Sequence, residues 1–205
     1  QHFLQLFHVY LPGTQAPLSA RLSLIRDELS SPLLQHQSFA VRALGEALKA
    51  HSFSRGVGVE MQGTRMPMDD WGPTDSEIYN YWRGCLELLT PIARGMDELA
   101  ALARQQIARN IMGLISFRRI GDLNQAIRGV VEARAQFAWP EAVKELRLAL
   151  RLFTNRLTEE EQKALQNLLE LLQPQTLAER LRDVVSLPAY DDLGGNEKEY
   201  TDEYG

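Results

Sequence analysis

The stretch from Pro17 to Ala50, PLSARLSLIRDELSSPLLQHQSFAVRALGEALKA, carries two apolar patterns of helical period joined by one short turn. Its first half repeats an apolar residue every three or four positions, at Leu18, Leu22, Ile25 and Leu29. This spacing predicts a helix that opens near Pro17, where a missing N–H does no harm in the first turn. A turn as short as the one that follows predicts an antiparallel helical hairpin.

The second half of the stretch predicts a helix from Pro32 to about Ala50. Ser31 fits its N-cap, since a serine hydroxyl accepts a hydrogen bond from a free N–H of the first turn, and Pro32 fits the first helical position. Seven residues are expected to face inward: Leu33, Phe39, Ala40, Ala43, Leu44, Ala47 and Leu48.

Further helix starts are marked by three capping boxes, in which a threonine and a glutamate three residues later satisfy each other's free N–H groups. They are Thr74–Glu77, Thr158–Glu161 and Thr176–Glu179, and each precedes an apolar stripe. Trp139-Pro140 predicts another helix start. Pro91 should kink or end the helix that begins after Thr74, because its ring clashes with the preceding turn.

These patterns predict an all-α fold of about eight helices in antiparallel pairs, either α-solenoid-like or an irregular helical array. We expect this helical domain to cover residues 1–189 and an acidic linker or tail to cover 190–205. Residues 1–13 fit a short strand or the end of a helix equally well, because their apolar residues suit both periods.

Residues 51–73, HSFSRGVGVEMQGTRMPMDDWGP, interrupt the helical pattern with four glycines and two prolines. Their Val57, Val59 and Met61 alternate as a half-buried strand would. Connections beyond about 12–15 residues without regular structure tend to be functional or disordered, and the apolar content argues against disorder. We therefore predict one long ordered loop or short hairpin over 51–73.

This insertion holds the best candidates for ligand or partner contact. Arg55 and Arg65 could hold a carboxylate or phosphate in bidentate fashion, with Glu60 and Gln62 on the same side of the alternating run. The simpler reading is that an arginine pairs with Glu60 or fixes the loop to helix carbonyls.

Two aromatic residues near the insertion complete the candidate set. Trp71 and Tyr79 could stack a base or a peptide, although packing of the insertion against the next helix is the simpler reading. No catalytic residue, metal ligand or cofactor is predicted: Cys85 has no base partner, and the four histidines share no ligand spacing.

Charge is distributed unevenly along the chain. The net charge is −5, but residues 191–205 hold six acidic residues and one basic residue, which leaves 21 acidic and 21 basic residues in 1–190. A neutral body argues against nucleic acid, which needs a phosphate-neutralising patch, unless the bases are segregated to one face.

The chain lacks an apolar run of the ~20 residues that a bilayer span requires, so a membrane partner is not expected. Its first residues, QHFLQLFHVYLPG, do not form a secretory signal pattern. From its ragged ends we expect one section of a larger cytoplasmic protein.

Residues 39–48, FAVRALGEAL, follow a helix and a Ser-Ser-Pro turn, and they resemble the second helix of a HEAT-like repeat. A wider order of residues is similar to helical regions of large bacterial STAND-type or AAA-like P-loop ATPases, some of them anti-phage defence proteins: Phe53-Ser-Arg55, Val59-Glu60-x-Gln62-Gly63, Trp71-x-Pro73 and Tyr79-x-Tyr81-Trp82. The acidic run 190–204, with its tyrosines, is similar to connectors in such proteins. The phosphate-binding loop is missing, so the resemblance implies a parent protein and no active site here.

The sequence thus favours a non-catalytic helical scaffold or sensor module of a larger bacterial protein. Its expected partner is protein, first of all other domains of its own chain. The alternative is a small-ligand-binding or enzymatic domain with its site under the 51–73 loop.

Overall fold

The structure is a computed structural model that describes residues 2–51, 70–133 and 138–172. This part of the chain is helical throughout its regular structure. Two short 3-10 helices, η1 and η2, cover His2–Phe7 and Thr154–Arg156. The α-helices are α1 (Leu18–Leu29), α2 (Leu34–Ala47), α3 (Asp75–Ala93), α4 (Glu98–Ser116), α5 (Ile120–Val131), α6 (Pro140–Phe153) and α7 (Glu159–Leu172).

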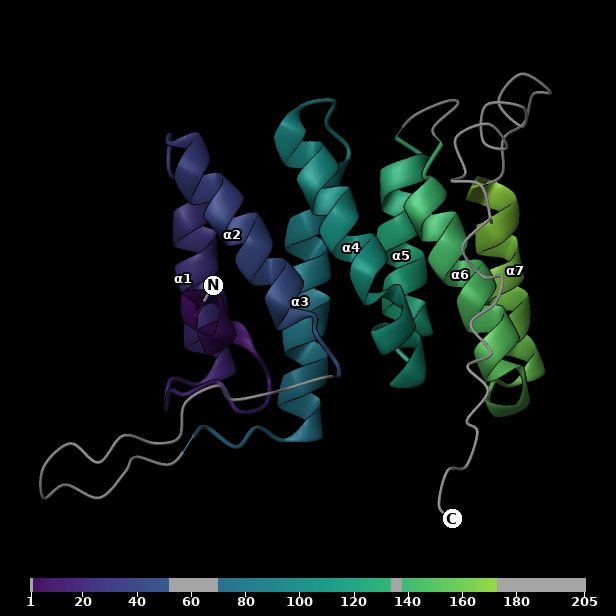
Figure 1. The fold of residues 1–205 in the computed structure, drawn as a ribbon, viewed down its shortest axis with the longest axis horizontal. Coiled ribbons are helices and arrows are strands. Elements are labelled where there is room, and N and C mark those ends of the chain that lie inside the picture. The colour runs from purple at the N-terminus through teal and green to yellow at the C-terminus, as the bar shows by residue number, and fades with distance from the viewer. Residues whose placement is uncertain (1, 52–69, 134–137, 173–205) are drawn as a thin grey trace, which may run out of the picture. The chain divides into compact units, whose positions relative to one another are not determined.

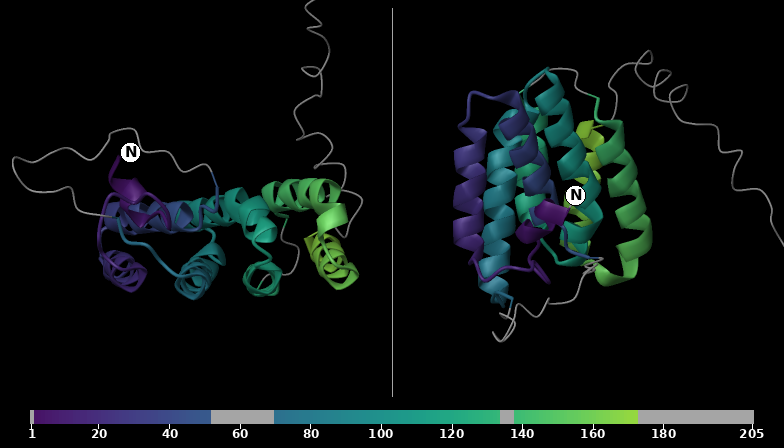
Figure 2. Two further views of the ribbon diagram at one scale, coloured as in Figure 1. Left: turned by 90° about the horizontal axis from the view of Figure 1, so that it is seen from below. Right: turned by 60° about the vertical axis from the view of Figure 1, so that its left-hand side comes forward.

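The seven helices of residues 18–172 form two layers, and successive helices run antiparallel (Figures 1 and 2). In one layer α3 packs between α1 and α5, and α5 packs against α7. In the other layer α4 packs between α2 and α6. Each helix also contacts the helix that precedes or follows it in the other layer. The prediction of an all-α fold built from antiparallel helix pairs is therefore confirmed.

Trp82 on α3 lies where the two layers meet. It is fully buried, and its indole Nε1 donates to the Ala47 carbonyl oxygen at the end of α2 over 3.1 Å. The ring of Phe117, just after α4, meets it edge-on at 5.2 Å between centroids. Satisfying the indole N–H inside the core removes the cost of burying it. One side chain thus holds three consecutive helices together.

The close approach of α2 and α4 depends on glycine. A Cβ at Gly45 would lie 2.0 Å from Gln106 Oε1, and a Cβ at Gly113 would lie 3.0 Å from the Cβ of Ala50. A side chain at either position would force its neighbour, the Gln106 side chain or Ala50, or the helix backbone to shift.

Arg21 on α1 fixes the segment that connects η1 to α1. The side chain is 4% exposed, and it donates from Nη1 to the His8 carbonyl at 2.7 Å and from Nε to the Ala16 carbonyl at 2.8 Å. The Tyr81 hydroxyl donates to the Phe7 carbonyl at 3.1 Å. A buried guanidinium needs such acceptors, because desolvation without them is costly. Residues 2–7, which the apolar pattern left undecided between strand and helix, are a 3-10 helix.

Two of the expected capping boxes are present. Thr74 Oγ1 accepts from Glu77 N while Glu77 Oε2 accepts from Thr74 N, and Thr158 and Glu161 repeat the arrangement. The third, Thr176–Glu179, lies outside the described residues, as do the tail 190–205 and positions 52–69 of the expected insertion.

One predicted boundary is wrong, and one of the two alternatives for Pro91 is excluded. The helix expected from Pro32 begins at Leu34 after an extended Leu33, and Ser31 Oγ accepts from Leu33 N instead of capping the helix; Leu33 is exposed, not inward. Pro91 does not end α3, which continues to Ala93. The proline ring is tolerated because it lies in the last turn of α3. The carbonyl that loses its helical hydrogen bond belongs to Glu87, which is exposed.

Candidate functional site

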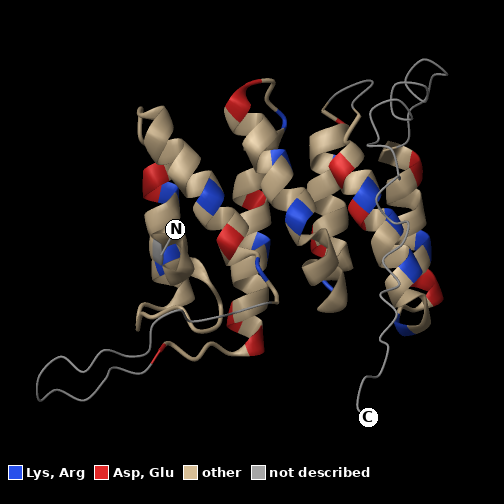
Figure 3. Ribbon diagram, viewed as in Figure 1, with Lys and Arg blue, Asp and Glu red and all other residues tan. Residues whose placement is uncertain are grey.

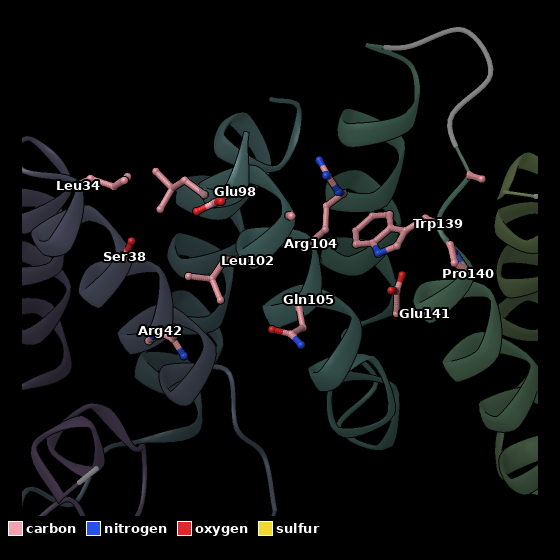
Figure 4. Close-up of a pocket in the computed structure, with 13 residues that line it drawn as sticks. Leu34, Ser38, Arg42, Glu98, Leu102, Arg104, Gln105, Trp139, Pro140 and Glu141 are labelled. Atoms are coloured by element: carbon pink, nitrogen blue, oxygen red, sulfur yellow. The ribbon is translucent and has the colours of Figure 1, made fainter. Parts of the chain in front are cut away.

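An open depression of about 620 Å³ crosses the α2–α4–α6 layer near the first turns of its three helices. Figure 4 shows its lining, which comes from α2 on one side, α4 in the middle and the start of α6 on the other. The residues are Leu34, Ser38, Arg42, Glu98, Leu99, Ala101, Leu102, Arg104, Gln105, Ala138, Trp139, Pro140 and Glu141.

The floor of the depression is apolar. Leu99 and Leu102 lie one turn apart on α4 and are half-buried, and Trp139 packs into the core at the entry to α6. Leu34, the first residue of α2, is 58% exposed at the edge. An exposed leucine next to a half-buried apolar floor is typical of a surface that receives another apolar group.

Charged side chains form the rim. Asp97 caps α4 by accepting from Ala100 N at 2.8 Å, which places Glu98 in the first turn of that helix. Glu141 likewise lies in the first turn of α6. Both carboxylates gain from the positive end of the helix dipole. Arg42 faces them from α2, and it forms no hydrogen bond or ion pair with any described residue.

Arg104 has a structural role at this site. Its Nη1 donates to the carbonyls of Ala93 and Gly95 at 2.8 and 2.9 Å. These carbonyls lie at and just beyond the end of α3, where the helix itself offers no donor. The guanidinium therefore caps α3 and holds it against α4.

Four of the residues predicted to contact a ligand, Arg55, Glu60, Gln62 and Arg65, fall outside the described ranges. The other two are placed by the core and take no part in the depression. Trp71 N donates to the Thr14 carbonyl at 3.0 Å. Tyr79 lies on α3 under the Arg119 guanidinium, 4.5 Å from the ring centroid, and 6.1 Å from the ring of Trp82. The ring contacts of Tyr79 with Arg119 and Trp82 are packing contacts, as the simpler reading expects.

A second groove, of about 580 Å³, lies between α3 and α5 in the other layer, and most of its charged side chains form contacts within the chain. Arg83 Nε donates to Asp122 Oδ1 at 3.0 Å, Asp122 also binds Arg119, and Arg94 Nε donates to the Gly129 carbonyl at 2.7 Å. These contacts join α3 to α5 and leave few polar groups for a ligand.

Reactive groups in the described residues are engaged or buried. Cys85 is fully buried, and burial raises the pKa of its thiol far above the usual range, so the thiol stays protonated. His8 Nε2 lies 2.8 Å from Glu46 Oε2, and His51 Nε2 lies 2.6 Å from Ser116 Oγ. Within the described ranges no three His, Cys, Asp or Glu side chains converge as a metal site would require.

No protein-family model, curated protein or solved structure matches the chain. None of the helices in the described ranges combines the length and the apolar character needed to cross a bilayer.

Reasoning from the sequence missed the depression because its lining is shared by residues about 100 positions apart. One local signal was available. The α4 stripe is wider than a single buried face, since Leu99 and Leu102 lie beside the fully buried Ala103 and Ile107. A broad apolar arc of this kind indicates that part of the helix surface meets something beyond its own core.

Proposed function

We propose that the chain is a non-catalytic helical scaffold or sensor module of a larger bacterial multidomain protein, and that it binds protein through the depression on α2, α4 and α6. The partner is most directly another part of the same protein. The open depression itself carries the proposal: a shallow apolar floor with a charged rim, supplied by three helices.

The geometry suits a protein segment better than a small molecule. Sites for small ligands are clefts that bury most of the ligand surface, with a few converging polar groups. Here the lining comes from three helices, the half-buried Leu99 and Leu102 of α4 form its floor, and the charges stand at its rim (Figure 4). Docking of a helix into an apolar groove uses such a surface.

Site-specific photo-crosslinking tests this proposal. A photo-reactive phenylalanine analogue replaces the exposed Gln105 in the depression, in the full-length protein expressed in its natural cell. We expect a discrete crosslink to a protein segment, identified by mass spectrometry. The matched control carries the same analogue at Asn167, an exposed position on α7. Crosslinks of equal yield and pattern at both positions would show that the depression is ordinary surface.

The parent protein is proposed to be a STAND-type or AAA-like P-loop ATPase, a group that includes anti-phage defence proteins. The resemblance of residues 39–48 and of the 53–82 order supports this. The full-length reading frame tests it: a phosphate-binding loop together with ATP hydrolysis is expected, and a frame without that loop would exclude it.

A small-ligand site under the 51–73 loop is the second candidate function. One observation favours it: Arg21 Nη2 and Trp71 Nε1 are buried donors without a hydrogen-bond partner among the described residues. Buried donors of this kind are usually satisfied by water or by a ligand. Small carboxylates and inorganic phosphate should then raise the melting temperature of the chain, and Arg55→Ala should abolish that effect. Unchanged melting with every anion would remove this candidate.

A further inference from the structure

The exposed basic residues of the α2–α4–α6 layer lack acidic partners. Five of them form no ion pair or side-chain hydrogen bond with any described residue: Arg42, Arg109, Lys144, Arg147 and Arg151. Arg42 lines the depression, and Arg109 follows the lining residue Gln105 by one turn of α4. Lys144 follows Glu141 by three residues on α6. The five bases, which we call the basic face, thus lie on all three helices of the layer: Arg42 in the depression, and the other four further along α4 and α6. Figure 3 shows basic segments along each of these helices.

In the opposite layer and its turns, several arginines form ion pairs with acidic residues of the same chain. Arg83 and Arg119 both bind Asp122, Arg118 binds Glu161 at 2.7 Å, and Arg128 lies 3.5 Å from Glu132. Pairing within the molecule is therefore the usual arrangement for exposed arginines on α3, α5 and their turns. The five bases of the basic face lack such partners in the part of the chain that the structure describes, and Arg42 among them lines the depression. Arg26 on α1 and Lys163 on α7 are also unpaired among the described residues, but they do not line the depression.

Resting on the proposed function, we propose that the basic face and the depression together bind an acidic amphipathic helix of a protein partner. Apolar residues on one side of that helix cover Leu34, Leu99 and Leu102. Its carboxylates lie over Arg42, Arg109 and Lys144. With neighbouring helix axes ~8–10 Å apart, three helices span ~20 Å, which is the length of a helix of ~13 residues.

Charge complementarity decides against the other anionic class of partner, nucleic acid. Glu98 and Glu141 stand on the rim beside the same floor, where phosphates following the bases would meet two carboxylates. Leu34 would remain uncovered on a phosphate backbone. A helix can place its own basic or polar residues against the two glutamates and its carboxylates against the bases, so electrostatic fit and apolar burial are satisfied together.

A peptide selection tests the proposal. Random 16-residue peptides are displayed against the whole 205-residue chain, and the pool is depleted on the Leu102→Arg variant. We expect the enriched peptides to be net acidic with apolar residues at helical spacing, and to bind with a Kd of ~10–100 µM at low salt, weakening at high salt. Because Leu102 is half-buried, Gln105→Trp repeats the depletion without removing a packed side chain.

Charge reversal supplies the second readout. R109E/K144E should weaken the enriched peptides by tenfold or more. The matched control, R26E/K163E, reverses two exposed bases on α1 and α7 of the other layer and should change binding less than twofold. Thermal unfolding confirms that both variants fold. Equal effects of the two variants would overturn the proposal.

The remaining outcomes separate this inference from the proposed function. Neutral or basic peptides that bind at the depression would overturn the acidic partner and leave the protein-binding role in place. If no selected peptide binds the wild type more tightly than it binds the Leu102→Arg and Gln105→Trp variants, both the acidic partner and the protein-binding role are excluded. A labelled 20-nucleotide single strand or duplex that binds more tightly than the peptides, and loses binding in R109E/K144E, would assign the face to nucleic acid and overturn the proposal.

Discussion

Glu46, which is half-buried, is the acid among the described residues whose ionisation the fold changes most clearly. His8 Nε2 lies 2.8 Å from its Oε2, and Lys49 Nζ donates to the same oxygen at 3.1 Å. The hydrogen bond with His8, helped by Lys49 and opposed by burial, lowers the pKa of Glu46 from 4.5 to about 2. The pair fixes η1 and the residue after it to α2.

The lowered pKa gives a pH-dependent contribution to stability. A depressed carboxyl pKa stabilises the fold above the unfolded value of 4.5, and the contribution disappears as the pH falls through about 2. We expect Glu46→Gln to lower the free energy of unfolding by ~1 kcal/mol at pH 7, since partial exposure and solvent screening reduce the full effect. Urea unfolding of both proteins from pH 7 to pH 2 should show the difference shrinking below pH 4.5.

The matched control is Glu87→Gln, at an exposed glutamate on α3. Its stability should stay within ~0.5 kcal/mol of the wild type at every pH. A Glu46→Gln difference that is constant down to pH 2 would mean that the side chain acts by packing and not by charge.

At the scale of the helix, the structure shows which features of the sequence are local. Thr74 and Thr158 cap their helices as expected because the hydrogen bonds close within three residues. Trp139-Pro140 begins α6 without a capping side chain, because the fixed φ of proline suits the first helical position. Pro91 does not end its helix because the cost of a proline depends on how many turns follow it, which the periodic pattern does not define. The depression was not predictable, because its floor forms only when α2, α4 and α6 lie side by side.

The contact of α2 with α4 gives a prediction of its own. Gly45→Ala should lower the free energy of unfolding by ~1–3 kcal/mol, although alanine favours a helix by ~1 kcal/mol over glycine. The new Cβ would meet three side-chain atoms of Gln106, which is 5% exposed and has little room to move. Chemical unfolding followed by far-UV circular dichroism measures the change.

Gly121→Ala is the matched comparison within α5. Nothing lies within 4 Å of a Cβ at this position, so the substitution should leave stability unchanged or raise it by up to ~1 kcal/mol. If Gly45→Ala proved as harmless as Gly121→Ala, α2 and α4 would have to lie further apart than the structure places them.

At the scale of the molecule, the stability of each helix depends on the helices that pack against it. Each helix contacts mainly the next helix in its layer and the adjoining helices of the other layer. In such arrays stability is approximately a sum of helix and interface contributions, and the ends can open without the middle. The buried contact of Trp82 with Ala47 and Phe117 adds to the middle, since it joins α3 to the helices on either side of it in sequence.

Native-state hydrogen exchange should resolve this gradient. Within the described residues α3, α4 and α5 have a neighbour on both sides in their own layer, whereas α1, α2, α6 and α7 have one. We expect the slowest amides in the first three helices, with opening free energies at least ~1–2 kcal/mol above those of α1 and α7. Mass spectrometry of peptic fragments in low denaturant measures this helix by helix. A single opening free energy shared by all seven helices would instead show one cooperative unit, in which the middle gains nothing from its extra neighbour.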